Sequence, residues 1–101
     1  MLTVVMTNIE PLFELGEVVM TRGAQNTLVE LNIDPAVLIT RHVTGDWGNI
    51  PPEDQKSNKN AVKNGDDRVF SAYPLPPDNT KVWVITEWDR SYTTILLPEE
   101  Y

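Results

Sequence analysis

Residues 81–97, which read KVWVITEWDRSYTTILL, decide the fold of this chain. They contain two runs rich in β-branched and aromatic residues, 81–87 and 92–97, which are typical of β-strands. The segment between the runs is short and centred on Asp89, so it leaves room only for a tight turn. Two strands joined by so few residues pair antiparallel, and the stretch therefore predicts a β-hairpin.

Two further strands are indicated upstream of this hairpin. Residues 68–73 have the composition of a strand, and residues 74–80 contain three Pro, an Asp and an Asn, which is typical of a loop. Residues 12–20 are rich in apolar side chains and predict the first strand of the fold, with a kink or bulge at Gly16. Pro98 is expected to stop the last strand.

Two helices are expected to follow the first strand. Thr21 is a preferred N-cap residue for a helix over residues 22–31, in which apolar side chains recur every three or four positions. Asp34 is a second cap residue, and Pro35 after it is tolerated at a first helical position. The pair therefore predicts the start of another helix, over residues 35–43.

A third helix completes the expected fold. Residues 53–64 predict a very polar helix that begins after Pro52 and ends at Gly65. The expected fold class is α+β, with an N-terminal strand, two to three helices and then a three-stranded antiparallel meander. The helices should pack on one face of a four-stranded antiparallel sheet.

The length and composition of the chain indicate one domain. Its 101 residues are close to the commonest domain size, and 41% of them are hydrophobic, which is enough for a core. We expect a single domain over residues 12–101, preceded by a flexible arm over residues 1–11. The absence of Cys excludes disulfides and cysteine-bound zinc. Because we find neither a signal peptide nor an apolar run of the ~20 residues that span a bilayer, we expect a cytoplasmic protein with no membrane partner.

The charge of the chain favours a protein partner over nucleic acid. Fifteen acidic residues outnumber eight basic ones, which gives a net charge of -7. Nucleic-acid binding usually depends on clustered Lys and Arg, whereas the densest basic group here is Lys56, Lys59 and Lys63 on one helix face. We interpret that face as solvated. An acidic domain fits a basic protein surface, or its charge simply keeps it soluble.

His42, the only histidine, lies near the end of the second predicted helix. Two interpretations are open: a general acid or base, or a packed histidine bonded to a nearby carbonyl group. The run Gly45-Asp46-Trp47-Gly48 comes shortly after it and suggests a shaped loop in which Trp47 plugs the core. Asp46 would either bond loop amides or orient His42.

Polar residues also lie on the predicted strands. Alternation places Val69, Ser71 and Tyr73 on one face of their strand, and Thr93 lies in the last strand, where cross-strand pairing is its simplest role. The charged turn of the hairpin suggests a binding edge, or ordinary turn chemistry. We take as candidate binding residues Asp46, Trp47, Arg68, Tyr73 and Trp88.

The motifs of several common chemistries are missing from the sequence. We find no Gly-rich phosphate loop, no Gly-x-Ser-x-Gly elbow and no His/Cys metal set. The adjacent acidic pairs at positions 53–54, 66–67 and 99–100 lack a recognisable ligand spacing. We therefore expect neither a metal nor a cofactor.

Four runs of this chain are distinctive as sequence motifs: residues 41–48 (RHVTGDWG), 83–87 (WVITE), 89–91 (DRS) and 93–101 (TTILLPEEY). Together they resemble a widespread family of small bacterial proteins carried on plasmids and phages. The resemblance covers residues 16–101. Some members are labelled as a subunit of a type I restriction methylase, for which they are far too short. The resemblance implies an origin on a mobile genetic element and assigns no activity.

The order of predicted elements also resembles the barnase–EndoU–colicin–RelE-like ribonucleases, which place helices before a four-stranded antiparallel sheet. Several of those enzymes use a helical His with Ser or Thr on the strands. The resemblance implies that His42 is the acid or base, and that Ser71 and Thr93 hold the phosphate. It also implies that Arg68 or Arg90 stabilises charge in the transition state.

Two functions therefore stand as hypotheses. The first is a non-enzymatic regulator or inhibitor from a mobile genetic element, for example of the anti-defence type, that binds a protein such as a host defence nuclease. The alternative is a small metal-independent ribonuclease or toxin-like enzyme that binds nucleic acid and uses His42, Ser71, Arg90 and Thr93. The sequence leaves open whether the protein is an enzyme and what its oligomeric state is.

Overall fold

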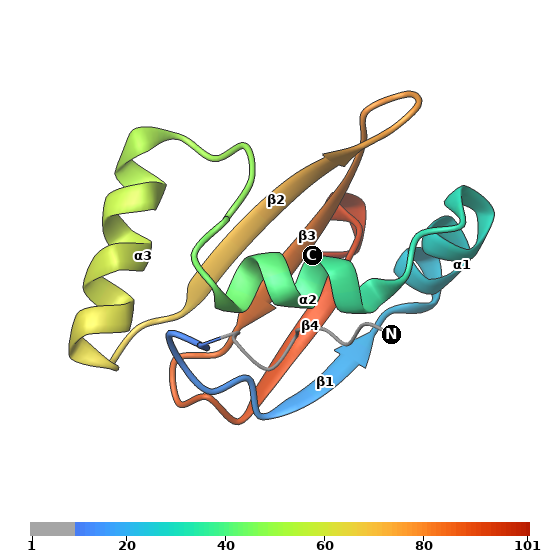
Figure 1. The fold of residues 1–101 in the computed structure, drawn as a ribbon. Helices are drawn as coiled ribbons and strands as arrows, with labels where there is room; N and C mark the ends of the chain where they lie inside the picture. The colour runs from blue at the N-terminus through green and yellow to red at the C-terminus, as the bar shows by residue number, and fades with distance from the viewer. Residues whose placement is uncertain (1–9) are drawn as a thin grey trace, which may run out of the picture.

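The computed structural model describes residues 10–101. In this part of the chain the elements follow in the order β1 (Glu17–Met20), α1 (Arg22–Leu31), α2 (Pro35–Val43), α3 (Pro52–Asn64), β2 (Val69–Leu75), β3 (Thr80–Thr86), β4 (Tyr92–Leu96) and a short 3₁₀ helix η2 (Pro98–Glu100) (Figure 1). The α+β class that the sequence predicts is confirmed.

The helices begin and end where local capping chemistry places them. The side chain of Thr21 accepts a hydrogen bond from the N–H of Ala24 at 3.1 Å, and that of Asp34 accepts one from Ala36 at 2.9 Å. The bounds of α1 and α2 therefore match the prediction. α3 begins one residue earlier than predicted and ends at Gly65, which has a φ of +71°.

The four strands form one mixed sheet in the order β1-β4-β3-β2. β2, β3 and β4 pair antiparallel in chain order, whereas β1 runs parallel to β4. The prediction of a wholly antiparallel sheet is therefore wrong. A short turn forces neighbouring strands to pair antiparallel, but β1 and β4 are separated by three helices and two strands, so no turn fixes their relative direction.

β1 is shorter than the predicted strand over residues 12–20. Gly16 has a φ of +65°, and a Cβ at this position would lie 2.3 Å from the carbonyl oxygen of Ser91. The chain therefore bends at Gly16, and pairing with β4 begins only at Glu17. β2, in contrast, extends past the predicted end and includes Pro74.

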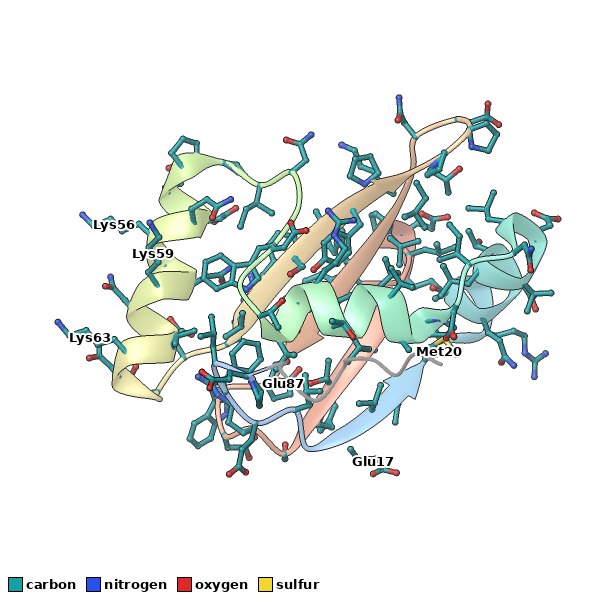
Figure 2. All side chains as sticks on the ribbon, in the orientation of Figure 1. Glu17, Met20, Lys56, Lys59, Lys63 and Glu87 are labelled. Atoms are coloured by element: carbon teal, nitrogen blue, oxygen red, sulfur yellow. The ribbon has the colours of Figure 1, made fainter. Side chains whose placement is uncertain are left out.

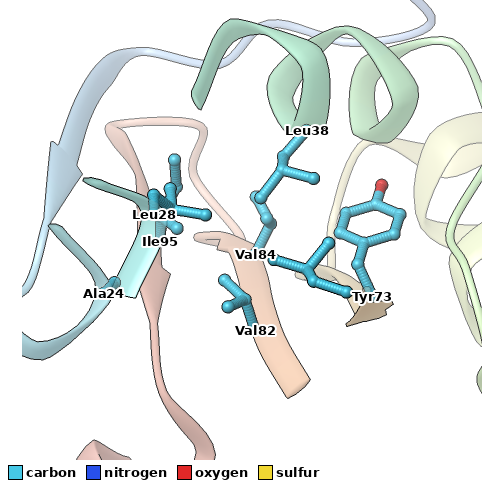
Figure 3. Close-up of a cluster of buried hydrophobic side chains, with 8 residues drawn as sticks. Ala24, Leu28, Leu38, Tyr73, Val82, Val84 and Ile95 are labelled. Carbon is cyan, nitrogen blue, oxygen red and sulfur yellow. The ribbon is translucent and has the colours of Figure 1, made fainter. Parts of the chain in front are cut away.

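α1 and α2 pack on one face of the sheet, and α2 crosses it in front (Figure 1). They enclose the main core, most of which Figure 3 labels: Ala24, Leu28, Leu38, Tyr73, Leu75, Val82, Val84 and Ile95. α3 lies instead beside β2, at the edge of the sheet (Figure 1). The prediction that the helices share one face therefore holds for α1 and α2 and is wrong for α3, whose mostly polar surface cannot cover a sheet face.

The predicted arm over residues 1–11 falls largely outside the described residues. Glu10 and Pro11 are described, and both are exposed. The N–H of Leu12 donates to the carbonyl oxygen of Val43 at 2.8 Å. This bond attaches the segment before β1 to the end of α2. None of the helices between residues 10 and 101 has the length and apolar character needed to cross a membrane.

Candidate functional site

His42 lies in the last turn of α2, on the side of the helix that faces the sheet. Its Nδ1 lies 2.6 Å from Oγ of Ser71 on β2, and its Nε2 lies 2.9 Å from Oγ1 of Thr86 on β3. Leu38, one turn earlier, is buried on the same stripe of the helix. The amphipathic pattern of α2 thus brings the imidazole to two hydroxyl groups of the sheet.

The hydrogen bonds continue across the sheet toward β1. Oγ1 of Thr86 lies 2.7 Å from Oγ1 of Thr93 on β4, and Thr93 donates to the carbonyl oxygen of Leu15 at 2.7 Å. Because a hydroxyl has a single hydrogen, Thr86 must donate to Thr93 and accept from Nε2–H of His42. Nδ1 then accepts from Ser71. The bonds therefore fix the tautomer of the ring, and we call these four side chains the polar chain.

The polar chain is sealed from solvent. Each of its four side chains belongs to a residue that is 0% exposed. Burial lowers the pKa of His42 to about 3, so the ring is neutral at neutral pH. Both ring nitrogens are occupied by hydroxyl groups of the protein. The arrangement can tie α2 to the sheet, but it offers no free nitrogen to a substrate.

Asp46, which the sequence suggests could orient His42, bonds elsewhere. Its Oδ2 lies 2.6 Å from Nε of Arg41, and its Oδ1 accepts from the N–H of Gly48 at 3.3 Å. The hydrogen bond from Arg41 is the main reason why the pKa of Asp46 is lowered. The same guanidinium lies 4.4 Å from the ring centre of Tyr73, whose hydroxyl donates to the backbone carbonyl of Asp46. These contacts shape the loop after α2.

Trp47 plugs the core, as its loop sequence suggests. It is 5% exposed and packs in a second cluster with Ile50, Ala61, Val69 and Ala72. Its Nε1 donates to the backbone carbonyl of His42 at 3.1 Å. The indole is therefore part of the core, bonded to the backbone at the end of α2, and is not a surface contact.

Arg90 is used by the fold and does not bond to the polar chain. Its guanidinium donates to four backbone carbonyl groups, at 2.5 to 3.2 Å, those of Ala61, Asp67, Glu87 and Trp88. It also lies 5.6 Å from the ring centre of Phe13, whose ring meets His42 edge-on at 5.3 Å. Arg90 therefore ties the hairpin turn to the end of α3. Phe13 packs against Arg90 and against His42.

Arg68 and Trp88 belong to the surface. Nη1 of Arg68 donates to the hydroxyl of Tyr101 at 3.1 Å, and its guanidinium lies 5.8 Å from the ring centre of Phe70. Phe70 and Ser71 are adjacent on β2 and so point to opposite faces of the sheet. Arg68 therefore lies on the face opposite the polar chain. Trp88, in the hairpin turn, is 63% exposed.

The structure thus brings together three of the four predicted catalytic residues and places them inside the core. His42, Ser71 and Thr93 are joined through Thr86, and Arg90 bonds elsewhere. The polar content of the hairpin included Thr86, but the predicted catalytic set did not. Its signal was alternation, because Thr86 shares a face of β3 with the buried Val84.

The outer edge of β2 is closed by a side chain of α3. The amide group of Asn58 accepts from the N–H of Phe70 at 3.0 Å and donates to its carbonyl oxygen at 2.7 Å. Asn58 thus takes the place of a neighbouring strand. Sequence reasoning missed it, although it lies three residues before Ala61 on the one buried stripe of α3.

Loop backbone and a proline close the rest of this edge. The N–H of Ala72 donates to the carbonyl oxygen of Trp47, and its own carbonyl accepts from the N–H of Asn49. Gly48 forms a bridge to Ala72, where a Cβ would lie 2.1 Å from the Ala72 oxygen. The next residue that points outward, Pro74, has no N–H to offer.

β1, at the opposite edge, pairs only with β4 among the described residues. The N–H groups of Glu17 and Thr21 donate to β4 or to the residue before it. Since backbone groups alternate sides along a strand, those of Val18 and Met20 point away from the sheet. No hydrogen-bond partner within residues 10–101 is recorded for these outward groups.

Exposed apolar side chains gather around β1. Residues 10–101 include nine large hydrophobic residues that are exposed, and six of them belong to residues 12–20, to the hairpin turn or to the start of β4: Leu12, Val18, Val19, Met20, Trp88 and Tyr92. The turn lies against Gly16, and Tyr92 pairs with Glu17. We call Val18, Val19, Met20, Trp88 and Tyr92 the β1 surface.

Among residues 10–101, no group of three His, Cys, Asp or Glu side chains is placed to hold a metal ion. Comparison of the chain with protein-family models, with curated proteins and with solved structures gives no match. The resemblance to plasmid- and phage-borne proteins therefore stays a prediction.

Proposed function

We propose that this protein acts without catalysis, as a regulator or inhibitor that binds another protein. The observation that supports this most is the burial of His42, since the only histidine of the chain is bonded on both nitrogens inside the core. The exposed apolar side chains of the β1 surface lie instead at the edge of the sheet and at the hairpin turn, with Val18 and Met20 on one face and Val19 and Tyr92 on the other. Grouped exposed apolar side chains beside polar residues are typical of protein-binding sites.

Charge favours a basic partner. The chain carries a net charge of -7, and Glu14 and Glu17 lie just before β1 and in it, at this edge of the sheet. Figure 2 shows Glu17 at β1 and Lys56, Lys59 and Lys63 on α3, at the other side of the molecule. Acidic groups beside an apolar surface attract a positively charged partner and speed its approach. The partner we propose is a basic surface of a host defence protein, encountered by a protein of mobile-element origin.

The ribonuclease alternative has less support. A general acid or base must come within hydrogen-bond reach of the reacting group, and His42 is enclosed by α2, β2 and β3. Arg90 is bonded to four carbonyl groups and is not free to stabilise a phosphate. We expect purified protein to leave labelled RNA intact over hours. Cleavage that His42→Ala abolishes, while the variant stays folded, would revive the alternative.

Partner capture tests the proposed function. Tagged full-length protein is incubated with lysate of a natural host, and captured proteins are quantified against a tag-only control. The double variant Trp88→Ser/Tyr92→Ser removes two aromatic side chains of the β1 surface. The control Val29→Ser/Val37→Ser removes two other exposed apolar side chains, from α1 and α2.

We expect wild type and the helix control to capture the same basic protein, and the Trp88/Tyr92 variant to capture at least about ten-fold less of it. A set of captured proteins no richer than that of the tag alone would contradict the proposal. So would equal capture by all three proteins.

A further inference from the structure

The two edges of the sheet differ in what their backbones offer. At β2, the outward groups of Phe70 and Ala72 are bonded by Asn58 and by the loop at residues 47–49, and Pro74 has no N–H. At β1, the outward N–H and C=O groups of Val18 and Met20 have no recorded partner within residues 10–101. Unpaired edge groups are the template on which an added strand forms its ladder.

The side chains at this edge suit an added strand. Val18 is 45% exposed and Met20 is 36% exposed, and in the extended chain both project from the same face of β1. Val19 projects from the other face, beside Tyr92 and Thr94 of β4. A strand laid along β1 would therefore find apolar contacts on both faces of the sheet as well as backbone partners.

We propose that β1 binds an extended, Lys- or Arg-flanked segment of another protein, which adds to the sheet as a fifth strand. This inference rests on the proposed function and specifies how the partner is held. The backbone of Val18 and Met20 supplies the hydrogen bonds. The carboxylates of Glu14 and Glu17, in and just before β1, supply the preference for basic flanking residues.

A second copy of the chain fits this edge less well than a basic segment. Two copies would each bring a net charge of -7 and the same carboxylates to the junction. Three of the four lysines, Lys56, Lys59 and Lys63, lie on α3, at the opposite side of the molecule (Figure 2). α3 is a helix and cannot supply strand hydrogen bonds to β1 of a neighbouring copy.

A peptide titration of the ¹⁵N-labelled full-length protein tests the inference. The probe is a synthetic peptide, Lys-Val-Thr-Val-Thr-Val-Lys, and its control is Glu-Val-Thr-Val-Thr-Val-Glu. Two protein variants separate backbone from side chain. Val18→Pro removes the outward N–H at a position where an edge strand tolerates proline, and Val18→Thr keeps that N–H with a side chain of similar shape.

We expect the lysine peptide to shift the Val18 and Met20 amide signals and to bind at least about ten-fold more tightly than the glutamate peptide. Val18→Pro should weaken binding at least about ten-fold, and Val18→Thr less than about three-fold. Equal effects of the two variants, or shifts confined to other residues, would overturn the inference.

Two further results would overturn the inference, and a third would separate it from the proposed function. A dimer in light scattering that Val18→Pro disperses would overturn the inference in favour of a second copy. Protected Val18 and Met20 amides in the free monomer would overturn it because the chain then covers its own edge. Failure of the peptide, with partner capture through Trp88 and Tyr92 intact, would remove this mode of binding and leave the proposed function standing.

Discussion

The two edges of the sheet differ in how their outward backbone groups are bonded within residues 10–101. The β2 edge is closed by Asn58, by a bridge at Gly48 and by Pro74, so its backbone groups are either bonded within the molecule or absent. The β1 edge carries exposed apolar side chains and outward backbone groups. Natural sheets usually protect both edges against association. Within residues 10–101, only the β2 edge is protected in this way.

The polar chain connects these two edges. It begins at Ser71 on β2, passes through His42, Thr86 and Thr93, and ends on the backbone carbonyl of Leu15, just before β1. Its last bond is one of the contacts that hold the segment entering β1. One run of hydrogen bonds therefore joins β2, the buried histidine and the segment that enters β1.

The largest predicted effect tests the closure of the β2 edge at Gly48. Gly48→Ala should cost about 4 kcal/mol, because left-handed backbone costs about 1 and the clash with the Ala72 oxygen about 3. Gly65 has a similar φ, and nothing lies within 4 Å of a Cβ built there. Gly65→Ala should therefore cost only about 1 kcal/mol. Chemical denaturation measures both, and equal losses would contradict the close bridge.

The next effect tests the side chain that closes the same edge. Asn58→Ala should cost about 2 kcal/mol of unfolding free energy, because the N–H and C=O of Phe70 lose their partners. Asn60 is exposed on the same helix, and Asn60→Ala should change stability by a few tenths of a kcal/mol in favour of the helix. If Asn58→Ala proves as mild as Asn60→Ala, the edge is not closed by this side chain.

The polar chain predicts a pH dependence of stability. Burial lowers the pKa of His42 to about 3 in the folded state, below its ordinary value of 6.5. The unfolded chain therefore binds a proton first as pH falls, and stability is complete above pH 6.5 and declines below it. The decline should be about 1.4 kcal/mol per pH unit, or about 2 kcal/mol between pH 6.5 and 5.

Urea titrations at several pH values measure this slope, and the variant His42→Gln supplies the control. Its own stability will be lower, but the histidine contribution to the slope between pH 6.5 and 5 should vanish. A wild-type protein whose stability is flat in this interval would show that the ring takes up a proton in the folded state, which the sealed polar chain does not allow.

The smallest effect belongs to the β1 edge. Val18→Thr should change the unfolding free energy by less than about 0.5 kcal/mol, because the side chain is half-exposed and its backbone groups point outward. Thermal denaturation of the variant beside Asn58→Ala measures the contrast between the edges directly. A loss as large as that of Asn58→Ala would mean that the β1 edge is as tightly packed as the β2 edge.

Features set by neighbouring residues could be predicted from the sequence. Thr21 and Asp34 cap helices through bonds to residues two or three positions away, and Gly65 ends α3 through its own backbone conformation. The stripe of α2 likewise placed His42 on the same side of the helix as Leu38, although the pattern left both a catalytic and a packed role open. Each of these depends on chemistry within one turn of the chain.

Features set by distant residues could not be predicted. The direction of β1 depends on pairing with β4, which lies 75 positions further along by register, and no local pattern encodes it. The role of Asn58 depends on its bonds to the backbone of Phe70, which the local pattern of α3 does not reveal. Ser71 and Thr93 were recognised as candidates, but only packing shows that Ser71 and Thr86 occupy both ring nitrogens of His42.

Native-state hydrogen exchange of the free, full-length protein tests the contrast between the edges most directly. The amides of Phe70 and Ala72 should exchange at least about a thousand-fold more slowly than in an unstructured peptide, because each donates to a group within the molecule. The amides of Val18 and Met20 should exchange within about ten-fold of the unstructured rate. Equal protection at the four amides would contradict the account of one closed and one open edge.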